Sequence, residues 1–278
     1  MDKRSIQRLM TSAGYYNGDI DGDFGPKTEQ GANKILERHL KSLPAGSTRW
    51  GITRKIIAAC QIILIHAGLE EEVGKIDGFW GPSTDYALTI WEHIQTHGKK
   101  PKAWREDEDI DHDAASIRGP WPLQRQADLI KYYGEPGGNQ CTAGKVNLPF
   151  PMRIAWNKRQ VIRRFSCHEK IARSAERVFQ RVANEYSIDD IKSLGLDLFG
   201  GCFNFRKKRG GSTLSTHAWG IAIDIDPERN QLKWSRTRAK LGGNHAGAFW
   251  DIWEREGWLS LGRAKNYDWM HVQAARLR

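Results

Sequence analysis

The chain has 278 residues, 39% of them hydrophobic, and a net charge of +10, which is enough apolar material for two packed domains. A mean hydropathy of −0.63 argues against a membrane protein. So does the longest aliphatic run, 62–65, which is far too short to cross a bilayer. The basic residues near the start are followed by no apolar segment, so we expect no signal peptide.

The cysteines lack the pairing typical of metal or redox motifs. They are scattered, and in a chain of this length without an export signal we expect reduced thiols. The run Cys167-His168-Glu169 could suggest a second metal site, but no partner pair stands at ligand spacing. We interpret it as a helix start with a buried cysteine. The four cysteines are Cys60, Cys141, Cys167 and Cys202.

Positive charge is concentrated in the C-terminal part of the chain. Residues 118–278 carry 28 Lys and Arg against 15 Asp and Glu. A basic surface of this kind attracts polyanions, such as nucleic acid, anionic lipid or a cell wall rich in carboxylates and phosphates. Charge alone does not choose among these partners, and the chain carries no recognised nucleic-acid-binding motif.

An internal repeat occupies the first hundred residues. The segment Ile20–Thr28, IDGDFGPKT, matches Ile76–Thr84, IDGFWGPST, which lies 56 residues later. Each copy predicts a helix, a turn built on Asp-Gly, and a second helix with a proline in its first turn, where proline is tolerated. Apolar residues at helical spacing follow each turn: Ala32, Ile35 and Leu36 in one copy, and Ala87, Leu88 and Trp91 in the other.

This pattern resembles the peptidoglycan-binding domain of the three-helix type, which is marked by a DGxFG-x-x-T turn and an apolar helix. The resemblance covers about residues 3–95 and implies a small all-helical module, residues 1–98, that holds cell-wall fragments near the turn. The first copy departs from the family at Gly31-Ala32-Asn33, where a more apolar helix is expected.

Two other interpretations of the repeat stay open. Both copies could be plain helical packing units in which Asp21 and Asp77 only form turns. Residues 19–23 could also suggest a calcium loop, but the glycine position and the distal glutamate of an EF-hand are missing.

Residues 99–117 are dense in charge and predict a solvated linker between two domains. His97 and His112 fall at or within this stretch and have no convincing ligand partners. The composition changes at Gly119, and we predict a second domain at 118–278. This domain is expected to be α+β with an antiparallel sheet, with helices near 123–133, 168–186 and 246–257 and extended segments near 150–156, 199–205, 220–225 and 272–274.

Two segments of the second domain carry the chemistry. The first, 215–224, reads STHAWGIAID, and the second, 268–271, reads DWMH. They supply His217, Asp224 and His271. Two imidazoles and one carboxylate, with one position left for water, are the ligand set of a catalytic zinc site.

Strand geometry explains how these ligands could meet. Gly220 allows a bend, and Ala222 and Asp224 fall on the same side of a strand because side chains alternate. His217 can fold back toward that side from the preceding loop, and His271 would enter from a neighbouring strand.

Three further residues have expected roles around the metal. Asp268 could take the proton of the metal-activated water and later pass it to the leaving amine. Arg206 can pair with a substrate carboxylate or a developing oxyanion. Ser215 can donate a hydrogen bond to the substrate.

Together these residues resemble the M15 family of zinc peptidases, the D-Ala-D-Ala carboxypeptidase and L-Ala–D-Glu endopeptidase group. That family is marked by S-x-H-x-x-G-x-A-x-D, a later E/D-x-x-H and an upstream arginine. The resemblance spans roughly residues 119–276. It implies that His217, Asp224 and His271 bind Zn²⁺ and that Asp268 is the general base.

The resemblance leaves some details open. The upstream arginine could be Arg206 or Arg209. An aspartate at position 268, rather than a glutamate, looks more like the endopeptidase branch. A non-haem iron oxygenase would use the same ligand types, but its carboxylate usually follows the first histidine by two residues, and here the separation is seven. We interpret the remaining His168 and His245 as structural or surface residues, and we assign core or groove-wall roles to Trp219, Trp250, Trp253, Trp258 and Trp269.

The sequence therefore predicts a peptidoglycan-degrading zinc peptidase of the phage endolysin type, with L-Ala–D-Glu cleavage preferred. We expect synthesis in the host cytoplasm, action on the wall after release, contact with an anionic envelope and a monomeric state, without specific nucleic-acid binding or membrane insertion. A virion-associated lysin fits nearly as well. The alternatives are a D-Ala-D-Ala carboxypeptidase and a wall-binding or virion structural protein whose peptidase domain is inert.

Overall fold

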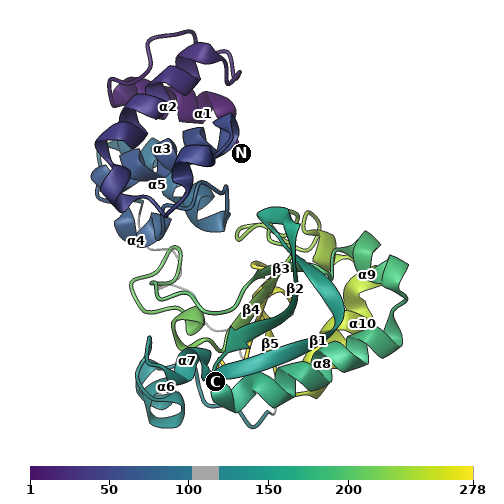
Figure 1. Cartoon of the computed structure of the whole chain (residues 1–278). Helices are drawn as coiled ribbons and strands as arrows, with labels where there is room; N and C mark the ends of the chain where they lie inside the picture. The colour runs from purple at the N-terminus through teal and green to yellow at the C-terminus, as the bar shows by residue number, and fades with distance from the viewer. Residues whose placement is uncertain (102–118, 278) are drawn as a thin grey trace. The chain divides into compact units, whose positions relative to one another are not determined.

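The computed structural model describes residues 1–101 and 119–277, and the chain divides into two compact units, Met1–Lys102 and Ala103–Arg278 (Figure 1). Most of the predicted linker 99–117, including His112, lies outside the described residues. The linker and the domain boundaries beside it therefore stay predictions.

The first unit is built from helices, and each copy of the repeat places a helix on either side of its Asp-Gly turn. Each of its longer helices directs one apolar face into a common core, which includes Ile6, Ile35, Ile56 and Leu88. The helices are α1 (Lys3–Ser12), α2 (Pro26–Arg38), α3 (Ile52–His66), α4 (Glu70–Val73) and α5 (Pro82–His97), with short 3₁₀ turns at Leu40–Ser42 and Ser47–Arg49.

A buried glutamine holds each Asp-Gly turn. In the first copy, Gln7 Nε2 donates to Asp21 Oδ1 at 2.7 Å, and the Gly22 amide donates to Gln7 Oε1 at 2.7 Å. In the second copy, Gln61 makes the corresponding bonds to Asp77 and Gly78, at 3.0 and 2.9 Å. Both glycines have positive φ, which residues with a side chain rarely adopt. Asp21 and Asp77 therefore form part of the two turns.

The two copies differ for local packing reasons. A Cβ atom at Gly31 would lie 2.3 Å from the carbonyl oxygen of Tyr15, so the glycine is required where α2 approaches the preceding segment. The second copy fills its longer connection with the short helix α4. The described residues contain no acidic cluster that could hold calcium at 19–23.

The second unit is an α+β domain, as predicted. Its described strands form one sheet in the order β2-β1-β3-β4-β6-β5. Neighbouring strands are antiparallel except for β1 and β3, which run parallel, so the sheet is mostly antiparallel. The strands are β1 (Gly144–Ile154), β2 (Asn157–Cys167), β3 (Leu198–Gly201), β4 (Ala222–Ile225), β5 (Leu259–Ser260) and β6 (His271–Gln273).

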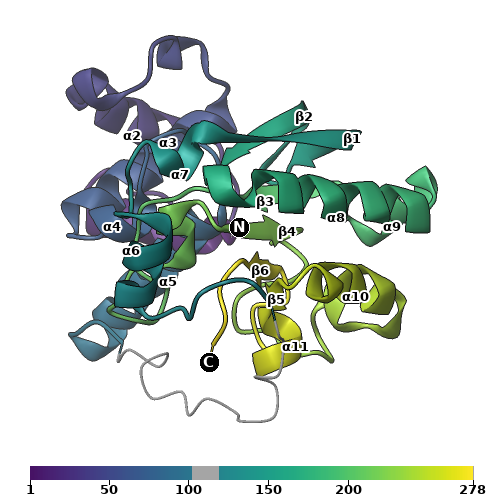
Figure 2. The same cartoon turned by 90° about the horizontal axis from the view of Figure 1, so that it is seen from below.

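Helices cover one face of this sheet. Figure 2 shows α8 lying along β1, with α10 beside it. Val178 and Phe179 of α8 and Trp253 of α10 pack in one core with inward-facing strand residues such as Val146 and Ile223. The helices are α6 (Gln126–Tyr133), α7 (Gln140–Ala143), α8 (Ala172–Glu185), α9 (Ile188–Leu194), α10 (Gly247–Arg255) and α11 (Leu261–Lys265), with 3₁₀ turns at Glu169–Ile171, Thr216–Trp219, Lys240–Gly242 and Asn244–Ala246.

Several predicted elements differ at their ends. Leu123 forms a bridge to Arg276 and lies before α6, which begins three residues later at Gln126. The extended segment predicted at 199–205 is shorter, because β3 ends at Gly201. The long edge strand β2 is a feature that we did not predict. Its exposed run of polar and charged residues hides the alternation by which a half-buried strand is detected.

The tryptophans and cysteines of the second unit lie where we expected them. Trp219, Trp250, Trp253 and Trp258 are at most 2% exposed and belong to the core, as does Trp269. All four cysteines of the chain are buried free thiols. Cys167 ends β2 inside the core, and the following turn forms no metal cluster within the described residues.

His168 is fully buried and holds two parts of the second unit together. Its Nε2 donates to the Tyr133 carbonyl at 2.8 Å, and its Nδ1 accepts the Lys170 amide at 3.1 Å. Burial lowers the pKa of the His168 imidazole below its ordinary value of about 6.5. The folded protein therefore keeps this ring neutral in a pH range where the unfolded chain binds a proton.

We expect the free energy of unfolding to fall as the pH is lowered below about 6.5, toward the folded-state pKa of His168, and to be unaffected by this group above that range. Urea unfolding at several pH values would measure the effect. A His168→Gln variant keeps a donor and an acceptor but cannot titrate, so it should show a smaller loss between pH 7 and 5. Equal pH dependence in the two proteins would contradict the assignment.

Candidate metal centre

Local structure brings the three predicted ligands to one face of the sheet. The 3₁₀ turn Thr216–Trp219 is capped by the Ser215 hydroxyl, which accepts the His217 amide at 3.4 Å, and it ends at Gly220, whose φ is 65°. A Cβ atom at Gly220 would lie 2.1 Å from the Cys141 carbonyl oxygen, so only glycine fits. The predicted bend is therefore confirmed, and it turns His217 back toward β4.

The register of β4 and β6 places the other two ligands directly opposite each other. Asp224 pairs with His271, and Ala222 pairs with Gln273. Side chains at alternating positions share a face, so these four point away from the core that receives Ile223 and Val272. The predicted entry of His271 from a neighbouring strand is confirmed.

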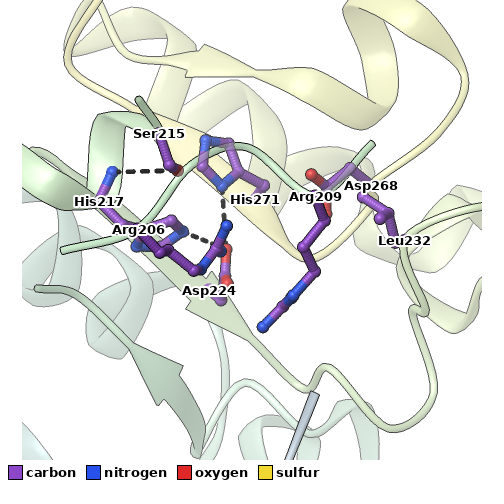
Figure 3. Close-up of a pocket in the computed structure, with 8 residues that line it drawn as sticks. All are labelled: Arg206, Arg209, Ser215, His217, Asp224, Leu232, Asp268 and His271. Atoms are coloured by element: carbon purple, nitrogen blue, oxygen red, sulfur yellow. Dashed lines mark hydrogen bonds and ion pairs between the residues drawn. The ribbon is translucent and has the colours of Figure 1, made fainter. Parts of the chain in front are cut away.

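The three side chains converge on a common point (Figure 3). One donor atom from each of His217, Asp224 and His271 lies within 4.8 Å of the other two. Asp224 Oδ1 is 3.2 Å from His217 Nε2 and 3.0 Å from His271 Nδ1. All three residues are buried, at 3 to 6% exposure.

Hydrogen bonds to the far side of each imidazole select the nitrogen that faces the centre. His217 Nδ1 donates to the Cys202 carbonyl at 2.6 Å, so Nε2 carries the lone pair. His271 Nε2 lies 3.2 Å from Gln273 Oε1 and donates to it, which leaves the lone pair on Nδ1. Bonds of this kind orient histidine ligands and fix their tautomers in metal sites.

Charge and burial also suit a cation. Burial lowers the pKa of His217, which keeps the imidazole neutral. Burial by itself would raise the pKa of Asp224, but the adjacent His217 and His271 outweigh it, and the pKa lies well below its ordinary value. His217 Nε2 is buried and has no hydrogen-bond partner among the described residues. Two imidazoles, one buried carboxylate and a buried nitrogen without a hydrogen-bond partner fit a divalent metal ion.

The remaining predicted site residues line the same pocket. Asp268, Ser215, Arg206 and Arg209 surround the three ligands, together with Leu232. Asp268 is 5% exposed, and its carbonyl accepts the His271 amide at 3.0 Å. Both candidate arginines reach the pocket, so the structure does not favour one of them by position.

Some residues at the site were missed by sequence reasoning. Gln273 orients His271, and its own Nε2 donates to Gln124 Oε1 and to the Ala275 carbonyl, both at 3.0 Å. Thr216 Oγ1 donates to Gln273 Oε1 at 3.3 Å. The position of Gln273, two residues beyond His271 in a strand, could have indicated that it shares the face of that ligand. The Cys202 carbonyl and Gln124 had no such signal.

We expect a Gln273→Met variant to bind metal about 10–100-fold more weakly, because His271 loses the acceptor that fixes its tautomer. Competition with a chromophoric chelator would measure the affinity. Gln124→Ala, one hydrogen bond further from the ring, serves as the matched control and should change the affinity much less. Unchanged affinity in Gln273→Met would contradict the role of this acceptor.

One comparison with known protein families bears on this site. Residues 209–274 match the family model Peptidase_M15_4, described as D-alanyl-D-alanine carboxypeptidase. The matched segment contains Ser215, His217, Asp224, Asp268 and His271, and it begins after Arg206. No curated protein and no solved structure matches the chain. The family match supports the M15 family and a peptidase, and His217, Asp224 and His271 could bind its metal.

Among the described residues, no helix has the length and apolar character needed to cross a bilayer.

Proposed function

We propose that this protein is a zinc-dependent peptidase that hydrolyses amide bonds in the stem peptides of peptidoglycan. The observation that carries the proposal is the convergence of the His217, Asp224 and His271 donor atoms inside the segment that matches the M15 family. Two imidazoles and a carboxylate are a common zinc ligand set in hydrolases and leave one coordination position open.

The residues around the ligands have complementary roles in this proposal. Zinc, when bound, supplies a Lewis acid that activates water and polarises a carbonyl. Asp268 accepts the proton of the attacking water and returns it to the leaving amine. Arg206 or Arg209 pairs with a carboxylate of the substrate. The hydroxyl of Ser215 accepts the His217 amide and has a proton to donate to the substrate.

Two cleavage sites have support. We favour the bond between L-Ala and D-Glu, because an attached wall-binding module suits an enzyme that acts on polymer, and because position 268 is an aspartate. The alternative is removal of the terminal D-Ala, which the description of the matched family favours. In the first case we place the protein among phage endolysins, made in the host cytoplasm and released to the wall, with virion-associated lysins as a near relative.

Digestion of purified sacculi, followed by mass spectrometry of the soluble products, tests the activity. New amine termini on D-Glu indicate the endopeptidase, whereas free D-Ala with intact L-Ala–D-Glu bonds indicates the carboxypeptidase. Both activities should stop in EDTA and return with Zn²⁺. Absence of any new terminus, with or without EDTA, would leave a wall-binding or structural protein as the better description.

We further propose that the first unit binds peptidoglycan and that the basic second unit favours contact with an anionic envelope. A sedimentation assay with sacculi and the full-length Asp268→Ala protein separates binding from hydrolysis. Binding that persists at high salt supports the module, and binding lost with salt indicates a charge effect alone. A gel shift with nucleic acid should be negative at physiological salt, and sedimentation analysis should give a monomer.

A further inference from the structure

The turn that carries Asp268 has an uncommon backbone conformation. Asn266 and Asp268 have φ values of 55° and 57°, in the left-handed region that side chains disfavour. Asn266 caps the C-terminal end of α11, and its amide donates to the Gly262 carbonyl at 2.8 Å. Two such residues within three positions persist only when neighbouring structure holds them, and such conformations cluster at functional sites.

One loop makes two of the hydrogen bonds that hold this turn. We name residues 229–241 the arm. The Leu232 carbonyl of the arm accepts the Asp268 amide at 2.9 Å. Four residues later, the Arg236 amide donates to Asn266 Oδ1 at 2.7 Å. The arm therefore contacts both left-handed residues of the turn, and one of the two contacts depends on a side chain.

The arm itself is fixed to the rest of the second unit. Asn230, which is fully buried, donates to the Asp226 carbonyl at 2.8 Å and accepts the Leu241 amide at 2.7 Å, so it closes the arm on itself. Trp250 Nε1 donates to the Leu241 carbonyl at 2.7 Å. The arm thus begins next to the strand that carries Asp224 and is held by a core tryptophan.

A side chain of the arm adds a second anchor outside the core. Arg236 Nε donates to the Gly242 carbonyl at 3.2 Å, and Arg236 Nη2 donates to Asn244 Oδ1 at 2.8 Å. These bonds fix the same residue whose amide reaches Asn266. Arg236 therefore links the 3₁₀ turn Asn244–Ala246 to the turn that carries Asp268.

We infer that Asn266 is a positioning residue that, through the arm, sets the carboxylate of Asp268 in the pocket. The inference rests on the proposed function, in which Asp268 is the base. Asparagine tolerates the left-handed conformation, and its side-chain oxygen provides the bond to Arg236. A displacement of about 1 Å at a reacting group can cost about 10²-fold in rate, so a loosened turn should affect the chemical step.

Three variants separate the conformation of Asn266 from its hydrogen bond. Asn266→Gly keeps the left-handed backbone but removes the oxygen that anchors the arm. Asn266→Asp keeps both features and is the conservative replacement. Asn244→Ala removes an exposed acceptor of Arg236 and loosens the arm from outside. Asn147→Ala is the matched control, because Asn147 lies on β1 and its exposed side chain donates to Glu176 of α8.

We expect Asn266→Gly to lower kcat on soluble stem peptide by about 10–100-fold, with KM and zinc affinity within about twofold of the parent protein. Asn266→Asp and Asn147→Ala should keep kcat within about threefold, and Asn244→Ala should lower it in the same direction as Asn266→Gly by a smaller factor. A purely structural role would lower the melting temperature without this split between kcat and KM. All assays are run well below the melting temperature of each variant.

Two results would overturn the inference, and they differ. If Asp268→Ala is inactive while Asn266→Gly and Asn244→Ala both turn over like the parent protein, Asn266 does not position the base. If Asp268→Ala is itself fully active, the base assignment of the proposed function fails and the inference fails with it.

Discussion

Replacing Asp268 with alanine is expected to lower kcat for stem-peptide hydrolysis by about 10²–10⁴-fold, the range supplied by a positioned general base. Asp268 lines the pocket beside all three candidate ligands but is separate from them, so the variant should keep its zinc. Release of amine termini from sacculi measures the rate, and metal analysis measures the zinc content. Sacculus sedimentation should be unchanged.

Asp251→Asn is a suitable control for this experiment, because it removes a carboxylate of the same unit that pairs with Arg263 at 2.6 Å on the surface. Its rate should equal that of the parent protein. Full activity of Asp268→Ala would mean that another group accepts the proton. A loss of zinc together with activity would instead place Asp268 among the residues that maintain the metal site.

Replacing His271 with alanine is expected to abolish stoichiometric zinc binding and, with it, hydrolysis. His271 contributes one of three donor atoms, and its loss also leaves the buried Asp224 carboxylate without one of its two imidazole neighbours. The effect on zinc affinity should exceed the roughly 10–100-fold loss expected for removing only an outer hydrogen-bond partner. Elemental analysis and a chelator competition measure it.

His245→Ala is the matched control, since His245 is exposed and bonds only to the Lys240 carbonyl in the described structure, at 2.8 Å. It should retain both zinc and activity. EDTA treatment of the parent protein should reproduce the His271→Ala result, and added Zn²⁺ should reverse it. Full zinc content in His271→Ala would contradict the ligand set.

The repeat of the first unit shows which structural features can be predicted from local sequence patterns and which cannot. The Asp-Gly turns and the flanking helices follow from turn chemistry and helical spacing, which operate over a few residues. The glutamines that hold the turns, Gln7 and Gln61, were not identified, because their partners Asp21 and Asp77 lie 14 and 16 residues away. In the sequence, Gly31 departs from the more apolar helix expected there. The close approach of the Tyr15 carbonyl explains why a glycine stands at this position.

Most residues of the candidate site could be predicted from the sequence because their side chains have distinctive chemistry. Histidines and aspartates at unusual spacing predicted a metal. Strand alternation predicted that Ala222 and Asp224 share a face, and His271 was expected from a neighbouring strand. The register that pairs them directly required the folded sheet. The edge strand β2 was not predicted because residues 158–161 are exposed on both faces, which removes the apolar alternation on which a strand prediction depends.

The sequence by itself determined the types of residue at the site and their order, and hence the class of chemistry that we propose. Only the tertiary structure decided which nitrogen of each imidazole faces the centre and what holds the turn at Asp268. Those features depend on the Cys202 carbonyl, on Gln273 and on the arm. Backbone carbonyls and amides carry no residue identity, and their contacts form between segments far apart in the chain. A one-dimensional pattern therefore cannot show them.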